Sequence, residues 1–211
     1  MKMNYCAIIG DIVGSKSIQN RQEIQDQFKE VLNAVNVTFD KYIASNLTVT
    51  LGDEFQGLLL DPCVSFEMID YIKDQMHPIE LVFGIGVGKM ETSFEKHTSI
   101  GSDGPAYWYA RKMVDKAKLK EPSICLFSDS PEDTLINSLL LFTETCSKSQ
   151  TSKQKEIMKL YKEYGSQQKV ASILNISQSA VSTHLKKAYY HEIDRSINSI
   201  KEYLMEKWEE R

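Results

Sequence analysis

Near the middle of the chain lies the stretch Thr50-Leu51-Gly52-Asp53-Glu54-Phe55-Gln56-Gly57, an acidic tight turn between two apolar runs. We interpret these runs, residues 47–51 and 55–60, as two β-strands. A connection this short joins antiparallel neighbours. The stretch therefore predicts a β-hairpin that carries a carboxylate at its tip.

The elements around this hairpin predict the fold class. Before it come an apolar strand at residues 5–9 and a helix from about Arg21 to Ser45, whose apolar side chains recur at intervals of three and four. After it come a helix from Asp61 to about Met76 and a strand at residues 79–87. The order strand-helix-strand-strand-helix-strand is that of a ferredoxin-like sheet. We expect an α+β fold whose antiparallel sheet has its helices on one face, followed by a small all-α helix-turn-helix domain.

The remainder of the chain predicts a second, all-helical domain. The first domain ends with a helix at residues 106–118, a strand at 123–127 and a short helix at 134–142. Residues 144–152, rich in Ser, Thr and Lys, are the best linker candidate. Beyond them we expect four helices, at residues 153–164, 167–174, 178–190 and 193–210. The predicted domains are residues 1–143 and 152–211.

Two carboxylates are candidate metal ligands. Asp11 follows the first strand and Asp53 occupies the hairpin tip. Taken alone, Asp53 is more readily explained as a turn residue. In a ferredoxin-like sheet, however, the first strand is adjacent to the hairpin, and two close carboxylates are costly unless a cation neutralises them. Such an oxygen-rich pair suits Mg2+ or Mn2+, completed by water and phosphate oxygens. The loop Gly14-Ser15 precedes the first long helix, so its backbone N–H groups are placed to meet a phosphate.

Several motifs, taken in order, resemble those of class III nucleotide cyclases. They are Gly10-Asp11-Ile12-Val13-Gly14-Ser15, Leu51-Gly52-Asp53-Glu54-Phe55, Phe83-Gly84-Ile85-Gly86-Val87-Gly88, and Gly104-Pro105-Ala106 followed by Ala110-Arg111. The hairpin is also similar to the GGDEF signature of diguanylate cyclases, with Leu51 in place of its first glycine. The whole chain, tail included, resembles the SatD family of small bacterial proteins, whose biochemical role is poorly defined.

The cyclase resemblance implies roles for particular residues. Asp11 and Asp53 would bind the metal ions, and in an enzyme Glu54 would face the attacking hydroxyl while Arg111 would steady transition-state charge. The nucleotide-binding residues would be Ile12, through its carbonyl, with Gly14, Ser15, Gly52 and Arg111.

Three departures from the cyclase pattern affect catalysis more than metal binding. Val49 stands where the cyclases have a purine-reading lysine, and Tyr107 stands where they have an asparagine. The spacing from Gly104 to Arg111 is also one residue short of the cyclase pattern. These changes remove substrate selection and part of the rate enhancement. Metal and phosphate binding is therefore a firmer expectation than cyclisation.

The tail predicts a helix-turn-helix. Asn175-Ile176-Ser177 forms the turn, since Asn tolerates a left-handed backbone and Ser is a good N-cap. An ordinary helical hairpin is the alternative, but turn chemistry, apolar spacing and an outer polar face together favour double-stranded DNA as a partner. The candidate DNA-binding residues are Ser177, Gln178, Ser179, Ser182, Thr183 and Lys186. The last helix has apolar residues at intervals of three and four, so it either packs on its own domain or pairs with a second copy. Pairing would bring two DNA-reading helices together, as palindromic sites require. We expect a homodimer on this hypothesis.

Composition agrees with this division. The net charge is −4, but residues 1–142 carry 13 Lys and Arg against 20 Asp and Glu, whereas residues 143–211 carry 12 against 9. An acidic metal domain before a domain that meets phosphates would show this asymmetry. The four cysteines are far apart, which favours reduced thiols over disulfides or zinc. No signal-peptide layout and no apolar run of about 20 residues occurs, so we expect a cytoplasmic protein without a membrane partner.

Two further motifs predict packing. Gly84-x-Gly86-x-Gly88 lies inside a strand, which favours close contact with a helix over a dinucleotide fingerprint. The cluster Tyr107-Trp108-Tyr109 favours core or dimer packing over base stacking.

Three functions fit the sequence. The first is a transcriptional regulator whose cyclase-like domain senses a nucleotide or second messenger through a divalent metal. The alternative is a metal-dependent nucleotidyl cyclase or transferase regulated by its tail. A third is a degenerate fold kept for dimerisation.

Overall fold

The computed structural model describes residues 4–119 and 122–209. Within them the chain forms two compact units. The sheet unit comprises the residues up to Ser138 and those from Lys201 onward, and the helical unit is Leu139–Ile200. Helices α4 (Asp133–Lys148) and α8 (Tyr190–Glu209) each contribute residues to both units. None of the helices in these ranges has an apolar stretch that would cross a bilayer.

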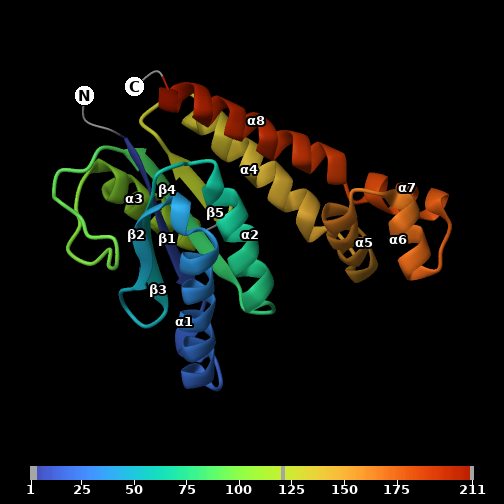
Figure 1. Cartoon of the computed structure of the whole chain (residues 1–211), viewed down its shortest axis with the longest axis horizontal. Coiled ribbons are helices and arrows are strands. Elements are labelled where there is room, and N and C mark those ends of the chain that lie inside the picture. The colour runs from blue at the N-terminus through green and yellow to red at the C-terminus, as the bar shows by residue number, and fades with distance from the viewer. Residues whose placement is uncertain (1–3, 120–121, 210–211) are drawn as a thin grey trace. The chain divides into compact units, whose positions relative to one another are not determined.

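A five-stranded sheet forms the centre of the sheet unit (Figure 1). Its order is β2-β3-β1-β4-β5, and neighbours are antiparallel except for the parallel pair of β4 and β5. The strands are β1 (Tyr5–Ile12), β2 (Ile43–Val49), β3 (Glu54–Leu59), β4 (Leu81–Gly88) and β5 (Ile124–Phe127). The predicted α+β, ferredoxin-like arrangement is confirmed for β1 to β4, and β5 extends it at one edge.

Helices α1 (Arg21–Thr38) and α2 (Val64–Met76) cover one face of this sheet. Phe28 of α1 makes a T-shaped contact with Phe55 of β3 at 5.8 Å, and Phe55 makes another with Phe83 of β4 at 6.3 Å. The Lys73 ammonium of α2 lies 5.6 Å from the Phe83 ring. The two helices therefore share one aromatic core with the central strands.

Helix α3 (Pro105–Leu119) covers the opposite face, a layer beyond the one-faced arrangement that we expected. Two glycines of β4 make this possible. A Cβ on Gly84 would lie 2.1 Å from the Ala110 carbonyl oxygen, and one on Gly86 would lie 2.1 Å from that of Ala106. The helix backbone thus rests directly on the strand, and the prediction of close helix packing at these glycines is confirmed.

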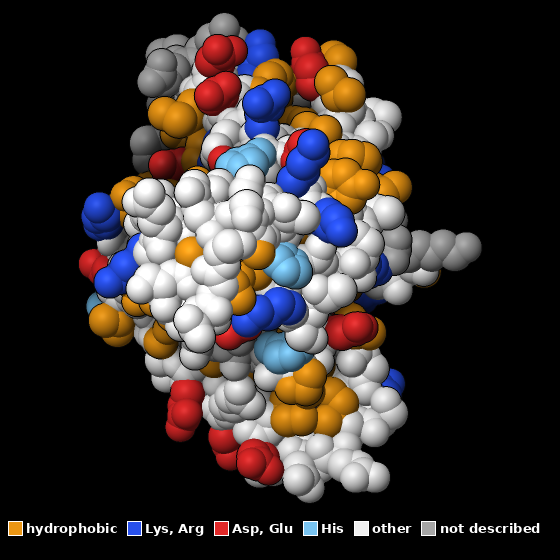
Figure 2. All heavy atoms as spheres, turned by 90° about the vertical axis from the view of Figure 1, so that its right-hand side faces the viewer, with side chains coloured by type: hydrophobic (Ala, Val, Ile, Leu, Met, Phe, Trp, Pro, Cys, Tyr) orange, Lys and Arg blue, Asp and Glu red, His pale blue; other side chains and the backbone are white. Residues whose placement is uncertain are grey.

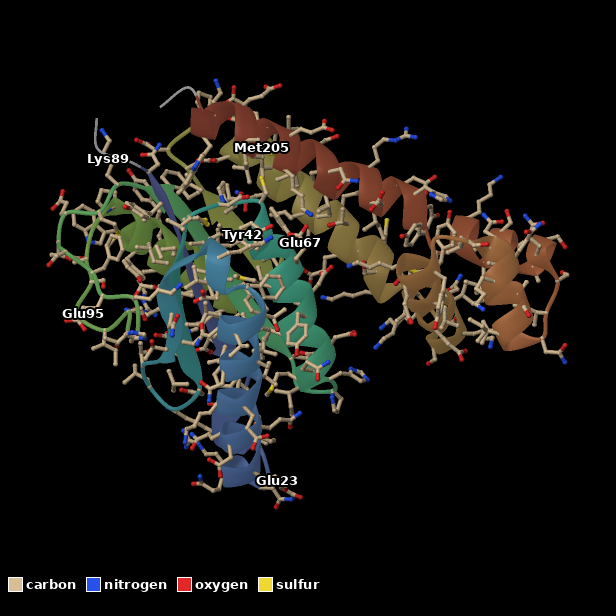
Figure 3. The ribbon with its side chains drawn as sticks, viewed as in Figure 1. Glu23, Tyr42, Glu67, Lys89, Glu95 and Met205 are labelled. Carbon is tan, nitrogen blue, oxygen red and sulfur yellow. The ribbon has the colours of Figure 1, made fainter. Side chains whose placement is uncertain are left out.

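The connection from β4 to α3 also lies on this face. It carries Lys89 and Glu95, which are labelled in Figure 3. The Ser45 hydroxyl of β2 donates to the Glu95 carbonyl at 2.6 Å, and the Gln56 amide of β3 donates to the Ser99 carbonyl at 2.7 Å. These bonds hold the connection against the hairpin strands beside α3.

Several boundaries differ from the sequence prediction, among them the ends of α1, α4 and α7. Helix α1 ends at Thr38, seven residues before the predicted end, because the β-prone stretch from Ile43 joins β2 instead. Helix α4 extends to Lys148, through most of the expected linker, because Thr143 and Cys146 are buried along one of its faces. The helix predicted at residues 178–190 ends at Lys187, and Tyr189 is left-handed (φ 56°) before α8 begins.

The helical unit has its own core. Helices α5 (Ser152–Tyr164), α6 (Gln167–Leu174) and α7 (Gln178–Lys187) pack around buried side chains. These are Ile157, Val170, Ala171, Val181 and Leu185. Thr151 and Gln154 form a reciprocal capping box at the start of α5, which satisfies two backbone donors that the helix leaves open.

Candidate functional site

The end of β1 and the start of β3 place two carboxylates side by side. Asp11 and Glu54 are direct partners in the antiparallel register of these strands. Directly opposite residues project from the same face of a sheet. That face is the one covered by α3, whose side chains reach both carboxylates.

Glu54 forms a bidentate ion pair with Arg111 of α3. One guanidinium nitrogen lies 2.7 Å from Oε1, and the other donates to Oε2. The Thr50 hydroxyl also donates to Oε1, at 3.0 Å. The Glu54 side chain is only 5% exposed, and burial alone would raise its pKa. The hydrogen bonds and charge of Arg111, helped by Thr50 and Lys118, outweigh burial and hold the Glu54 pKa below its ordinary value.

Asp11 has a different cation. The Lys118 ammonium lies 2.9 Å from Asp11 Oδ2 and 3.6 Å from Glu54 Oε2. Burial raises the pKa of Asp11, Lys118 opposes that rise, and the neighbouring charges of Asp53 and Glu54 add to it. Burial therefore outweighs Lys118, and the Asp11 pKa stays above its ordinary value.

Asp53 lies on the hairpin tip and is tied to the loop after β1. Its carboxylate accepts a hydrogen bond from the buried Ser15 hydroxyl, and its carbonyl accepts one from the Ile12 N–H at 3.0 Å. Gly52 and Gly14 have φ angles of 63° and 64°, a left-handed conformation that glycine adopts without strain. Asp53 also borders a hollow of about 10 Å³, room for about one water molecule.

The sheet unit thus brings its predicted site residues to one end of the sheet. They are Asp11, Ile12, Gly14, Ser15, Gly52, Asp53, Glu54 and Arg111. Their binding and catalytic roles stay predictions. Sequence reasoning missed Lys118, although its position seven residues after Arg111 puts both on one side of a helix. It also missed Thr50, which lies in the quoted turn itself.

The carboxylates at this end of the sheet are too few and too separate to form a resident metal site of their own. No group of three or more His, Cys, Asp and Glu side chains within residues 4–119 and 122–209 is placed to hold a metal. The two aspartates and the Ile12 carbonyl are hard oxygen donors, which Mg2+ and Mn2+ prefer, and Mg2+ commonly takes one or two carboxylates plus phosphate oxygens. The residues therefore fit an ion that arrives with phosphate better than a resident structural ion.

The aromatic cluster at the start of α3 has mixed environments. Tyr107 is buried in the core between α3 and the sheet. Tyr109 makes a T-shaped contact with Phe127 at 4.9 Å. Trp108 is half-exposed, and its indole N–H donates to Asp103 at 2.6 Å. Core packing is confirmed for Tyr107, whereas Tyr109 is only partly buried.

The helical unit contains the turn predicted at residues 175–177, between α6 and α7. Asn175 is left-handed (φ 52°), and the Ile176 N–H donates back to the Ala171 carbonyl at 3.0 Å. The Ser177 hydroxyl caps α7 by accepting from the Ala180 N–H at 3.1 Å. Buried Val181 and Leu185 orient α7 on the core, so that its other face is exposed to solvent.

The exposed face of α7 is polar and basic. The six candidate DNA-binding residues, Ser177, Gln178, Ser179, Ser182, Thr183 and Lys186, are all exposed. Residues 164–191 contain three lysines and no Asp or Glu. Figure 2, which views the molecule from the side of α6 and α7, shows mostly uncharged side chains with Lys and His near the centre of this face, and acidic side chains mainly toward its edges.

The fold of the sheet unit is similar to that of several solved structures. A structure of a bacterial light-regulated adenylyl cyclase is similar at 9% identity and a TM-score of 0.47, over 60% of this chain and 76% of that one. The guanylyl cyclase Cya2 is similar at 15% identity and a TM-score of 0.39, over 55% and 71%. A regulator of polyketide synthase expression from Bifidobacterium adolescentis is similar at 15% identity and a TM-score of 0.29, over 96% and 86%. No curated protein matches the sequence.

The family comparison covers both units. The match runs from residue 5 to residue 203. It includes the sheet, helices α5 to α7, and the carboxylates of Asp11, Asp53 and Glu54, which we call the carboxylate cluster. The chain belongs to the SatD family.

Proposed function

We propose that this protein is a DNA-binding transcriptional regulator whose sheet unit senses a nucleotide or second messenger through Mg2+ or Mn2+. The observation that carries the DNA half is the exposed face of α7. It presents Gln178, Ser182 and Lys186 next to a correctly capped turn, in a stretch without acidic residues. Amide and hydroxyl groups contact base edges, and lysine contacts phosphate.

The carboxylate cluster supports the nucleotide half. Asp11 and Asp53 supply hard oxygen donors at the end of the sheet. Lys118 pairs with Asp11, and Arg111 pairs with the neighbouring Glu54. A metal-bound polyphosphate would meet both kinds of group in one place: the ion at the aspartates, and the phosphate oxygens at the cations and at the N–H groups around Gly14 and Ser15.

The pairing of Glu54 with Arg111 favours sensing over turnover. These are the two residues that an enzyme of this kind would use on the attacking hydroxyl and on the transition-state charge. Here the Arg111 guanidinium and the Glu54 carboxylate form an ion pair with each other, and Glu54 is buried. Arg111 is half-exposed. Turnover would require it to leave Glu54 for a phosphate, and the metal-dependent cyclase or transferase is therefore the second candidate function.

Two further parts of the proposal are a homodimer and a cytoplasmic location. A dimer would present two α7 helices to a palindromic site, which doubles the contact surface and fixes the half-site spacing. All four cysteines are buried thiols, as a reducing compartment permits.

The test combines a nucleotide panel with selection of DNA sites from a random library. The full chain is incubated with nucleoside triphosphates and cyclic nucleotides plus Mg2+ or Mn2+, and products are separated by chromatography. The proposal predicts ligand binding without turnover, together with enrichment of a defined DNA site. Turnover that Asp53→Asn abolishes would establish the enzyme instead. Absence of both ligand binding and site enrichment would leave only the scaffold function.

A further inference from the structure

Lys118 has a distinctive position in the carboxylate cluster. Its ammonium is within hydrogen-bond distance of one Asp11 oxygen, at 2.9 Å, and close to Glu54, at 3.6 Å. Arg111 already satisfies Glu54 through two bonds, so Asp11 is the principal partner of Lys118. The Asp11 side chain is 16% exposed and the Lys118 side chain 36% exposed. The contact therefore lies at the rim of the cluster, where one partner can be exchanged for another.

Lys118 and a metal ion need the same carboxylate. An ammonium bound to Asp11 neutralises the charge that would attract a divalent ion and blocks one of its two oxygens. A bare ion that displaces Lys118 leaves the ammonium with two acidic neighbours in reach, Glu54, which Arg111 holds, and Asp115 on its own helix. A phosphate brought with the ion would instead offer the displaced ammonium new acceptor oxygens.

The side chain and its helix permit this exchange. Lys118 lies in the last turn of α3, one residue before the helix ends at Leu119. Lysine has a flexible four-carbon stem and three rotatable donors, so it can follow a new acceptor without movement of the backbone. Arg111 lies two turns deeper in the same helix and is fixed by a bidentate pair.

We propose that Lys118 makes the site selective for a metal ion bound to polyphosphate over the bare metal ion. It occupies Asp11 when no ligand is bound, yields Asp11 to the incoming ion, and then contacts a phosphate oxygen. The inference rests on the proposed metal and nucleotide binding of the sheet unit. A lysine that only braces α3 against β1 would affect folding stability and change both affinities in the same direction.

The experiment compares two probes that contain no nucleobase, Mn2+ alone and Mn2+ with inorganic tripolyphosphate. Binding of Mn2+ to the full chain is followed by electron paramagnetic resonance of the free ion, and binding of the complex by calorimetry. The variants are Lys118→Met and Lys118→Gln, with Lys116→Met as the matched control on an exposed position of the same helix. Circular dichroism verifies that each variant is folded.

We expect Lys118→Met to tighten Mn2+ binding about tenfold and to weaken binding of the Mn2+–tripolyphosphate complex by a similar factor. Lys118→Gln should behave in the same way, and Lys116→Met should leave both affinities unchanged. Equal shifts for the two probes, or no shift, would overturn the inference while leaving the metal site intact. If wild type, both Lys118 variants and the control bind neither probe, the proposed nucleotide-sensing function fails together with the inference.

Discussion

Asp11 and Glu54 stand opposite each other in β1 and β3, and each carboxylate has its own cation on α3. The two cations, Lys118 and Arg111, are seven residues apart, so they extend from one side of the helix toward two neighbouring strands. The pair at Glu54 is bidentate, whereas the Lys118 ammonium makes a single contact with Asp11. In our proposal the bidentate pair supports the fold and the single contact yields to a ligand.

The Glu54–Arg111 pair should contribute to stability in a pH-dependent way. At pH 7 we expect Glu54→Gln to lower the free energy of unfolding by about 2 kcal/mol, because a charge-assisted bond inside a buried site is lost. The folded-state pKa of Glu54 is below its ordinary value of 4.5, so this contribution is present above that pH and is lost as pH falls below it. Urea titrations at pH 7 and at pH 4 should therefore show a smaller gap between wild type and variant at the lower pH.

A surface ion pair provides the control for this measurement. Glu67, labelled in Figure 3, accepts from the Lys201 ammonium at an exposed position. Glu67→Gln should change the unfolding free energy by less than about 0.5 kcal/mol. An equal cost for Glu54→Gln and Glu67→Gln would contradict the structural role of the buried pair.

The contact between β4 and α3 should tolerate no side chain. Gly84→Ala would place a Cβ 2.1 Å from the Ala110 carbonyl and 2.3 Å from the Val114 nitrogen. Backbone atoms cannot rotate away, so we expect a loss of about 3 kcal/mol or more in a thermal or denaturant unfolding experiment. Gly101→Ala has open space but a left-handed φ of 84°, and should cost only about 1 kcal/mol. The reverse order of the two costs would argue against this packing.

The exposed face of α7 should govern DNA binding. Lys186→Ala should weaken binding to all sequences and reduce the salt slope of the binding constant by about 1. Gln178→Ala should relax preference at one base pair, at a cost of about 1 to 3 kcal/mol in discrimination. Fluorescence anisotropy over a salt series with matched and mismatched duplexes measures both effects.

A lysine outside α7 provides the control for the loss of one positive charge. Lys153 of α5 is paired with Glu156 at 2.8 Å, so Lys153→Ala should have a smaller effect on DNA affinity than Lys186→Ala. Equal effects of both lysine variants, with unchanged sequence preference in Gln178→Ala, would contradict the assignment of α7 as the recognition helix.

The sequence predicted local features well where short-range chemistry decides them. The turn at Asn175-Ile176-Ser177 followed from backbone preference and capping, and the structure contains it residue for residue. The close approach at Gly84 followed from glycine spacing. The face on which α3 packs did not follow, because it depends on which side of β4 those glycines leave open.

At the candidate site, too, the sequence predicted the local geometry but not the partners that come from distant parts of the chain. The hairpin tip and the end of β1 were predicted to meet, and the Ile12–Asp53 hydrogen bond joins them. The partners of the carboxylates were harder to predict, since Lys118 and Arg111 come from a helix more than fifty residues away in the chain. Ion pairing across such separations depends on packing that periodicity does not encode.

The most direct test of the account measures DNA affinity with and without the bound nucleotide and Mn2+, in wild type and in Asp53→Asn. We predict that the ligand changes the DNA affinity of wild type by at least about fivefold, the lower end of typical allosteric coupling. The Asp53→Asn variant should bind DNA as the ligand-free wild type does, whether or not the ligand is added. Equal DNA affinity of wild type with and without a ligand shown to be bound would contradict the central claim.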